Sequence, residues 1–335
     1  MNARPSLVAL LAATVAAPAL AEEVNVYSLR QPELVQPLFD RFTEETGIDV
    51  NVAFVEKGMV ERLVSEGDRS PADLVMTVDI ARLAQVVDAG VTQPVDSETL
   101  KANIPAEFRD PGNQWFGLTT RARIVYASKE RVKDGEVTTY EDLADPKWKG
   151  RVCTRSGTHD YNLGLTAAMI GHHGADQTRI WLEGLKANLA KKPQGGDRDQ
   201  VKSIWAGECD IALGNSYYMG AMLADPEQKA WADSVRIVFP TFEGGGTHMN
   251  VSGVAMTKSA PNKDAALKLM EFLSSDEAQR IYAEANTEFP VKPGVERSDL
   301  VKSWGEFTPD AVSLTDVAKA RPEALKLMEE VNFDG

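Results

Sequence analysis

The sequence predicts an α/β protein built as a two-lobed clamp, in which each lobe is a mainly parallel sheet flanked by helices. Three observations lead to this prediction. A strand–helix–strand order opens the chain after residue 22, which is typical of parallel sheets. The run 115–126 is long and apolar with polar residues at its middle, as expected of a strand that crosses between lobes. The length suits two domains, each with its own core.

The expected N-terminal lobe comprises residues 22–119 plus about 250–290, and the expected C-terminal lobe comprises 120–249 plus about 291–335. Two such lobes, joined by more than one crossing strand, can close on a ligand by hinge motion.

Residues 1–21 have the features of a secretory signal peptide. Arg4 precedes an apolar run that is too short to span a bilayer, and Ala19-Leu20-Ala21 forms a cleavage site. We therefore expect a soluble, exported protein that starts at Glu22. The formal net charge of −14 makes nucleic acid and anionic membranes unlikely partners.

The first lobe is predicted from strand-like alternation and from helix start and stop signals. Pro32 lies at the start of a helix and Gly47 stops it. Asp79 is expected to cap a helix that ends at Gly90. The expected elements here are strands at 24–28, 48–52 and 73–77 and helices at 32–46 and 80–90.

The second lobe is predicted to start a second sheet at Trp148, and 250–256 is expected to be the returning crossing. Ser274 and Glu277 form a capping-box pattern for one of the last helices. The remaining expected elements are strands at 148–154, 210–214 and 235–239 and helices at 163–170, 180–189, 199–206, 264–273, 276–285 and 322–331.

Cys153 and Cys209 are the two cysteines of the chain, and an even count in an exported protein favours a disulfide. Each lies eight residues before a tyrosine, Tyr161 or Tyr217. If the two strands are neighbours pinned at their starts, both tyrosines emerge at a similar height at the strand ends.

Tyr217 and Tyr218 follow a short buried strand and the helix-capping pair Asn215-Ser216. Two residues at such a corner can both face a cleft, and ligands of open α/β sheets bind at the ends of strands. The alternative is that both rings are half-buried with hydrated hydroxyls. Because the two tyrosines are adjacent and lie at such a corner, we favour a ligand-binding site over two half-buried rings.

Seven stretches of the chain, taken together and in their order along it, resemble the periplasmic solute-binding proteins of ABC importers. The resemblance is specifically to the ferric-iron-binding branch of the FbpA and FutA type. The resemblance covers essentially the whole chain after residue 21. The stretches that carry it are 26–30, 72–79, 117–123, 155–162, 206–212 with the tyrosine pair, 246–253 and the helical segment 265–279.

This resemblance implies capture of Fe(III) in the cleft by Tyr161, Tyr217 and Tyr218 and delivery to a permease and its ATPase in the inner membrane. It also implies that Arg121 holds a synergistic anion such as carbonate, or a nearby ligand. A monomer in the periplasm is expected. Relatives often carry His-Tyr where this chain has Gln31-Pro32, so the N-terminal lobe is expected to supply no strong ligand beyond the amide oxygen of Gln31.

Fe(III) is a small, hard, trivalent cation that favours anionic oxygen donors, and three tyrosinates balance its charge. A bound cation stabilises a phenolate that would otherwise form only near pH 10. Zinc prefers His or Cys and calcium prefers many carboxylates, and the sequence shows neither pattern.

Other polar residues leave alternatives open. Arg121 could instead form an ion pair between the lobes, and Arg123 is the second candidate for its anion role. Ser156 and Thr158 could bind an anion at a helix start or could simply form the turn. Asp79 is interpreted as a helix cap rather than a ligand. The histidines are interpreted without a metal role: His172 and His173 in a solvent-facing helix-end loop, His159 explained equally by its turn, and His248 as a hydrogen-bonding hinge residue.

Two other functions are alternatives to iron binding. An organic cation, such as a polyamine or thiamine, could be held against the aromatic rings, and phenylalanine would then replace tyrosine with little loss. A secreted hydrolase with a Tyr or Ser nucleophile is disfavoured, because no G-x-S-x-G motif is present and no base is placed near a nucleophile. We expect no enzymatic activity.

Overall fold

The computed structural model describes residues 22–55 and 57–335. The predicted signal peptide at 1–21 lies outside the described residues. Within the described ranges, no helix is long and apolar enough to cross a membrane.

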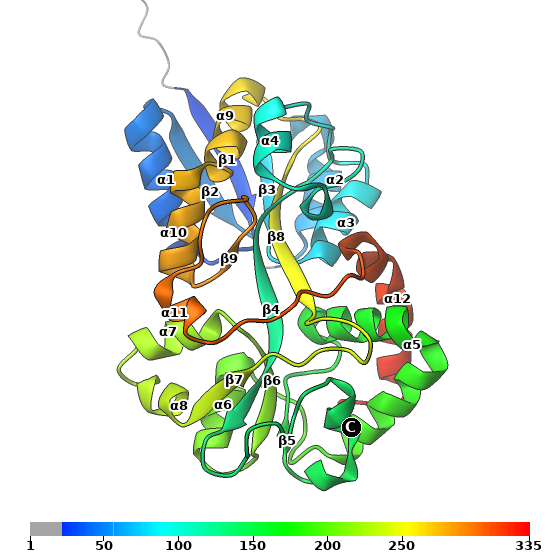
Figure 1. The fold of residues 1–335 in the computed structure, drawn as a ribbon. Coiled ribbons are helices and arrows are strands. Elements are labelled where there is room, and N and C mark those ends of the chain that lie inside the picture. The colour runs from blue at the N-terminus through cyan, green and yellow to red at the C-terminus, as the bar shows by residue number, and fades with distance from the viewer. Residues whose placement is uncertain (1–21, 56) are drawn as a thin grey trace, which may run out of the picture.

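Two lobes lie one above the other in Figure 1, and two long strands run between them. The predicted two-lobed α/β clamp is therefore confirmed. The strands are β1 (Glu23–Ser28), β2 (Asp49–Phe54), β3 (Leu74–Thr77), β4 (Phe116–Ser128), β5 (Val152–Cys153), β6 (Ile211–Asn215), β7 (Val235–Val238), β8 (Met249–Met256) and β9 (Phe289–Pro290). We call the part around β1–β3 the N-lobe and the part around β5–β7 the C-lobe; their exact boundaries stay a prediction.

The helices cover both lobes. In the N-lobe they are α1 (Pro32–Thr46), α2 (Met59–Glu66), α3 (Ile80–Asp88), α4 (Glu98–Asn103), α9 (Lys263–Leu273) and α10 (Asp276–Asn286). In the C-lobe they are α5 (Asp160–Ala187), α6 (Asp197–Trp205), α7 (Tyr218–Ala224) and α8 (Lys229–Asp233). The C-terminal segment adds α11 (Asp299–Lys302) and α12 (Leu314–Glu330).

The strands form one continuous sheet in the order β2-β1-β3-β8-β4-β6-β5, with β7 and β9 also paired to β4. The expectation of mainly parallel sheets holds for β1–β3 and for the β5–β6 pair. It is wrong around β4 and β8, where every pairing is antiparallel. The physical reason is that β4 leads out of the N-lobe and β8 returns beside it, so the two crossings run in opposite directions.

β4 is the long crossing strand expected at 115–126, and all its residues are buried. Its first half pairs with β8 and its second half pairs with β6. The register shifts between Gly117 and Thr119. A side chain at Gly117 would meet the backbone oxygen of Phe108, so only glycine allows this close approach.

Several predicted helix ends need correction. Ser275, rather than Ser274, caps α10 and accepts a hydrogen bond from the backbone N–H of Ala278, because Ser274 still has helical backbone angles at the end of α9. The last helix starts at Leu314, not near Pro322, because Ser313 caps it and the helix continues through the proline.

The histidine pair expected in a loop lies inside α5, which kinks at Gly174 but continues. The Nε2 atom of His172 lies 2.9 Å from a carboxylate oxygen of Asp310, and that of His173 lies 2.6 Å from Glu141. The solvent-facing interpretation was wrong, because tertiary contacts hold both rings where the flanking glycines suggested a loop.

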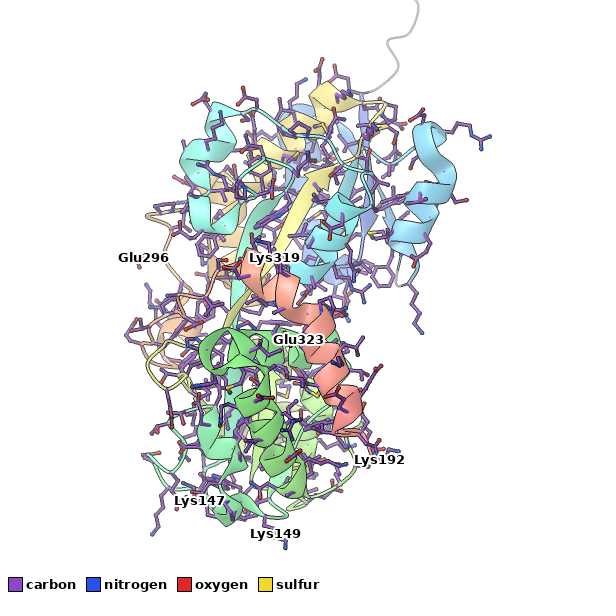
Figure 2. The ribbon with its side chains drawn as sticks, turned by 90° about the vertical axis from the view of Figure 1, so that its right-hand side faces the viewer. Lys147, Lys149, Lys192, Glu296, Lys319 and Glu323 are labelled. Carbon is purple, nitrogen blue, oxygen red and sulfur yellow. A yellow bond between two sulfur atoms is a disulfide. The ribbon has the colours of Figure 1, made fainter. Side chains whose placement is uncertain are left out.

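Hydrophobic clusters explain how the lobes hold together. One cluster around Phe42 fills the N-lobe and another around Ile204 fills the C-lobe. A third includes Leu83 of α3, Leu163 of α5 and Met328 of α12, so it is continuous between the lobes. Figure 2 shows α12 lying along α5, with Lys319 and Glu323 on its length and Lys192 near its far end.

Cys153 and Cys209 form a disulfide with their Cα atoms 6.0 Å apart, which confirms the prediction from their number and location. Cys153 lies at the end of β5, opposite Ala212 of the parallel strand β6. The bond therefore ties together the two strands that lead to the predicted tyrosines.

Candidate functional site

Tyr217 and Tyr218 stand where β6 ends and α7 begins, so the predicted strand-to-helix corner is present. Their ring centroids are 4.2 Å apart. The expected cap is absent, since neither side chain of Asn215-Ser216 caps α7. The oxygen of the Ser216 hydroxyl instead accepts a bond from Ala122 N–H in β4.

Tyr161 lies in the first turn of α5, eight residues beyond the disulfide. Nδ1 of His159 accepts a hydrogen bond from the backbone N–H of Tyr161 and so caps this helix. The hydroxyl oxygens of Tyr161 and Tyr217 are 3.3 Å apart. The structure thus brings together two tyrosines that are 56 positions apart in the sequence.

The three tyrosines line one cavity of about 100 Å³. Arg121 and Ser252 of the crossing strands form its back. The N-lobe side is made by Leu29, Arg30, Gln31, Leu34 and Val78, with Glu288 beside them. The cavity therefore lies between the lobes, with every phenol on the C-lobe side.

A larger cavity, of about 1080 Å³, lies between the crossing strands and the segment that links α11 to α12. It is lined by Phe289, Phe307 and Val312 among others, and none of the three tyrosines reaches it. Size alone would favour it, but the hydroxyls that can bind a metal converge only in the smaller cavity.

Three guanidinium groups surround the ring of Tyr161. Their central carbons lie 5.7 Å (Arg121), 5.9 Å (Arg123) and 5.0 Å (Arg155) from its centroid. Arg123 and Arg155 are both held by the buried carboxylate of Asp197, at 2.7 and 3.2 Å. Burial alone would raise the pKa of Asp197, but the two arginines outweigh it and lower this pKa. Three guanidinium groups thus lie around the ring of Tyr161, and two of them share the negative charge of Asp197.

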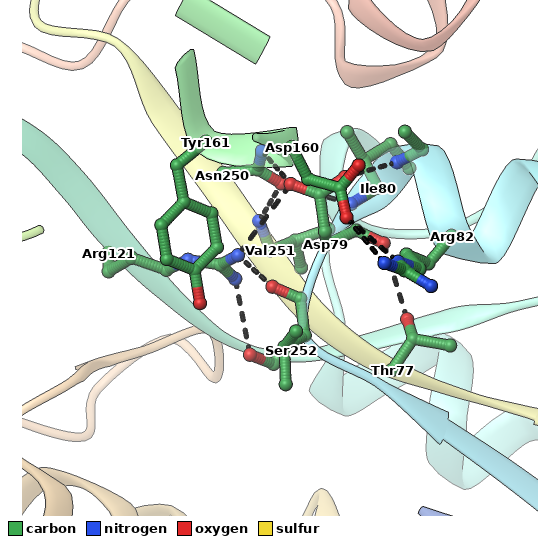
Figure 3. A network of polar contacts seen from close by, with 12 residues as sticks. Thr77, Asp79, Ile80, Arg82, Arg121, Asp160, Tyr161, Asn250, Val251 and Ser252 are labelled. Atoms are coloured by element: carbon green, nitrogen blue, oxygen red, sulfur yellow. Dashed lines mark hydrogen bonds and ion pairs between the residues drawn. The ribbon is translucent and has the colours of Figure 1, made fainter. Parts of the chain in front are cut away.

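Arg121 is buried and binds both crossing strands and the N-lobe (Figure 3). It donates to the hydroxyl of Ser252 at 3.1 Å and to the backbone oxygen of Val78, and it lies 3.9 Å from the carboxylate of Asp79. Arg121 therefore does contact the N-lobe, as the alternative to an anion-binding role required. Its cavity position also leaves it beside any anion bound there.

Asp79 caps α3 through the backbone N–H of Ala81, as predicted. Burial raises the pKa of its carboxyl to about 6, although Arg121 pulls in the opposite direction. Its other oxygen accepts from Asn250 of β8, so it fixes the start of α3 to a crossing strand.

Burial raises the pKa of the Tyr217 and Tyr218 phenols above their usual range, and the nearby Tyr161 adds to the shift of both. Without a cation, both phenols are therefore neutral at pH 7. A trivalent metal ion would supply the charge that stabilises the phenolates.

Among the described residues that line the cavity on the N-lobe side, none is a free anionic donor. The carboxylate of Glu288 receives two hydrogen bonds from Arg30, at 2.7 and 3.1 Å. Burial alone would lower the pKa of Arg30, but Glu288 more than offsets it and raises this pKa. Pro32 begins α1, and Gln31 precedes it with no capping bond. Gln31 is the neutral oxygen donor that remains on this side.

Ser156 and Thr158 do not line the cavity. The Ser156 hydroxyl donates to Asp334 at 2.5 Å, and the Gly157 N–H donates to the other oxygen of that carboxylate. The turn interpretation therefore fits these residues, and the anion interpretation does not. His248 hydrogen-bonds through its backbone N–H to Tyr140, while its buried side chain has no partner at Nε2.

Sequence reasoning missed Arg155, Asp197 and Glu288. Arg155 stands in the motif that precedes Tyr161, but its spacing does not show that it stacks against that ring. Among the described residues, no group of three or more His, Cys, Asp and Glu side chains could hold a metal.

Known proteins resemble this chain over nearly its whole length. Residues 28–280 match the family model for bacterial extracellular solute-binding proteins. Iron uptake protein A1 of Synechocystis sp. is 45% identical over 315 residues, which cover 93% of this chain and 88% of that protein.

Solved structures agree with this result. Apo ferric ion-binding protein A of Pasteurella haemolytica has a TM-score of 0.91 and 55% identity, covering 94% of this chain and 99% of its own. The FutA protein of Trichodesmium, in complex with iron and citrate, has a TM-score of 0.88 and 42% identity, covering 93% and 99%.

Proposed function

The chain belongs to the bacterial extracellular solute-binding protein family, and on this premise we propose that it captures Fe(III) between its lobes and delivers it to an ABC importer. Tyr161, Tyr217 and Tyr218 act as the metal ligands, each as a phenolate. The relatives named for iron uptake and ferric-ion binding support the choice of metal.

The single observation that carries the proposal is the meeting of the phenols, with 3.3 Å between the hydroxyls of Tyr161 and Tyr217. Neutral hydroxyls at this distance can share a hydrogen bond, but as anions they would repel each other. A hard trivalent cation between them removes that repulsion and balances three negative charges. Protons compete for the same oxygens, so iron is released more readily as the pH falls.

The remaining coordination positions are filled by an anion. The N-lobe side supplies only the amide of Gln31, and Arg121 lies at the back of the cavity. A guanidinium can hold a carbonate or a carboxylate through paired hydrogen bonds. Carbonate is the first candidate, and citrate is the second because a similar protein binds iron with citrate.

The cellular role follows from the family. A member of an extracellular solute-binding family works with a permease and its ATPase, here in the inner membrane, while the protein itself is a monomer in the periplasm. Its function is binding, and we assign no reaction to it.

A visible absorption spectrum tests the proposed iron binding. Purified protein mixed with ferric citrate should turn orange-red, because phenolate-to-iron charge transfer absorbs visible light. Tyr217→Phe combined with Tyr218→Phe should abolish the colour and the binding. A colourless wild type, or unchanged iron binding by the double variant, would refute the proposal. If the ligand were instead an organic cation held by the ring faces, the double variant would bind that cation with little loss.

A further inference from the structure

An ion pair joins the two lobes directly beside Tyr161 (Figure 3). Asp160 is the first residue of α5 in the C-lobe, and Arg82 lies on α3 of the N-lobe. The Nε atom of Arg82 is 2.9 Å from Oδ2 of Asp160, and a terminal nitrogen is 2.8 Å away. Arg321 of α12 binds the other carboxylate oxygen.

We propose that the Arg82–Asp160 pair is an interlobe latch that holds the N-lobe closed over the loaded tyrosines. The inference rests on the proposed function for the identity of the cargo, but not for the latch itself. It assigns Arg82 a positioning role in iron retention, since Arg82 does not line the tyrosine cavity.

The first reason is that the N-lobe needs contacts other than metal ligands to stay closed over the site. Its side of the cavity provides Arg30, whose charge is paired with Glu288, and the neutral Gln31. Among the described residues that line the cavity, this lobe offers no free negatively charged ligand for the metal. Contacts other than metal ligands must therefore help to keep the lobe closed, and these include the Arg82–Asp160 pair and the hydrophobic cluster shared by the lobes.

The second reason is the location of Asp160. Its backbone is bonded directly to Tyr161, so the carboxylate and the phenol share one helical turn. An acidic residue in the first turn is also favoured by the helix dipole. The side chain of Asp160 is 13% exposed and that of Arg82 is 35% exposed, so the pair is partly buried and is screened less by water than an ion pair with both partners exposed.

Arg321 offers a matched control. It binds the same carboxylate but belongs to α12, which packs mainly along α5 and also contacts α3. Removing Arg321 takes away an equal charge and leaves the Arg82–Asp160 pair in place. A comparison of Arg82→Gln with Arg321→Gln therefore separates the effect of losing the ion pair between the lobes from the effect of losing one positive charge beside Asp160.

The first experiment is small-angle X-ray scattering on the ligand-free mature protein. The pair links the two lobes, so Arg82→Gln should increase the radius of gyration, whereas Arg321→Gln should leave it at the wild-type value. This measurement does not depend on iron. If the wild type shows no charge-transfer band, the proposed function fails while the latch is still decided here.

The second experiment follows loss of the charge-transfer band of iron-loaded protein into excess EDTA. Arg82→Gln should release iron about tenfold faster than wild type, within the usual range of coupling between sites. Asp160→Asn should behave similarly, and the double variant should be no faster than either single one. Arg321→Gln should stay within about twofold of wild type.

The band position should not change in any of these variants, because the phenols are untouched. Thermal melting then shows that each variant is folded at the temperature used. The latch is refuted if Arg82→Gln matches wild type in both scattering and release, or if Arg321→Gln matches Arg82→Gln.

Discussion

Asp197 is the residue that connects the C-lobe arginines to the tyrosine corner. Its carboxylate accepts from Arg123, from Arg155 and from the backbone N–H of Asn215, the last residue of β6. It is fully surrounded by protein, so each of these bonds replaces water. One side chain thus fixes both the positive charge around Tyr161 and the strand end that presents the tyrosine pair.

Asp197→Asn should therefore destabilise the protein strongly. Removing one partner of a buried ion pair leaves uncompensated charge and typically costs about 3 kcal/mol or more. Urea unfolding followed by circular dichroism measures this change. Asp233→Asn is the control, because its pair with Lys229 is exposed and should change stability by less than about 0.5 kcal/mol. Equal stability of both variants would contradict the role of Asp197.

His248 should make the protein sensitive to acid. Burial lowers the pKa of its imidazole to about 3, so the folded protein holds it neutral while the unfolded chain protonates it near pH 6.5. The stability is fully present above about pH 6.5 and is lost as the pH falls toward 3, by up to about 1.4 kcal/mol per pH unit.

The check is urea unfolding at pH 7, 6, 5 and 4. His248→Gln should show a shallower loss of stability over this range than wild type, because glutamine does not titrate. Two parallel stability curves would mean that other groups cause the loss.

At the scale of elements, the disulfide acts on β5 and β6. The strands share only a short parallel pairing, Val152 with Ile211 and Cys153 with Ala212. A bond that closes a loop of 56 residues contributes about 4 kcal/mol when its effect is on the unfolded chain. The folded geometry of the tyrosines depends in addition on the antiparallel pairing of β6 with β4.

Cys153→Ala combined with Cys209→Ala should therefore lower the melting temperature markedly and yet keep the charge-transfer band at low temperature. Differential scanning calorimetry measures the first effect and visible absorption the second. Loss of the band in a protein that remains folded would show that the disulfide also sets the position of the tyrosines.

The sequence allowed most elements to be predicted, because their signals are local. Gly47 ends α1 in a left-handed conformation, and Asp79 caps α3, as expected. Strand direction around β4 was not predicted, since it depends on which distant strand returns beside it. The solvent-facing interpretation of the histidine pair failed for a similar reason. Gly174 does break the helical backbone directly after the pair, as its glycine suggested, but Asp310 and Glu141 hold the two rings against the protein.

The candidate site shows the same difference between residues that local patterns identify and contacts that depend on the fold. Tyr217 and Tyr218 could be singled out from their place after a buried strand, and Tyr161 from its motif. Arg155 and Asp197 could not, because the contact between them depends on the packing of α6 against the strand ends. Local patterns singled out the tyrosines that we propose as oxygen donors, while the charges that surround them required the three-dimensional fold.

At the scale of the whole molecule, the three phenols belong to one lobe, and the described N-lobe residues that line the cavity offer no free anionic donor. The Arg82–Asp160 pair joins the lobes beside these phenols. The lobes must therefore open before iron can enter, and they close again over the bound metal.

This order of events predicts the kinetics. In stopped-flow mixing with excess ferric citrate, the rate at which the charge-transfer band appears should approach a plateau as the concentration of the chelate rises, because the lobes must open before the tyrosines can take up the metal. Arg82→Gln should raise this plateau, because the variant lacks the ion pair that holds the lobes together, and it should also release iron faster. A rate that rises linearly over the whole concentration range in the wild type would contradict this order, since it would mean that the metal binds without a prior opening of the lobes.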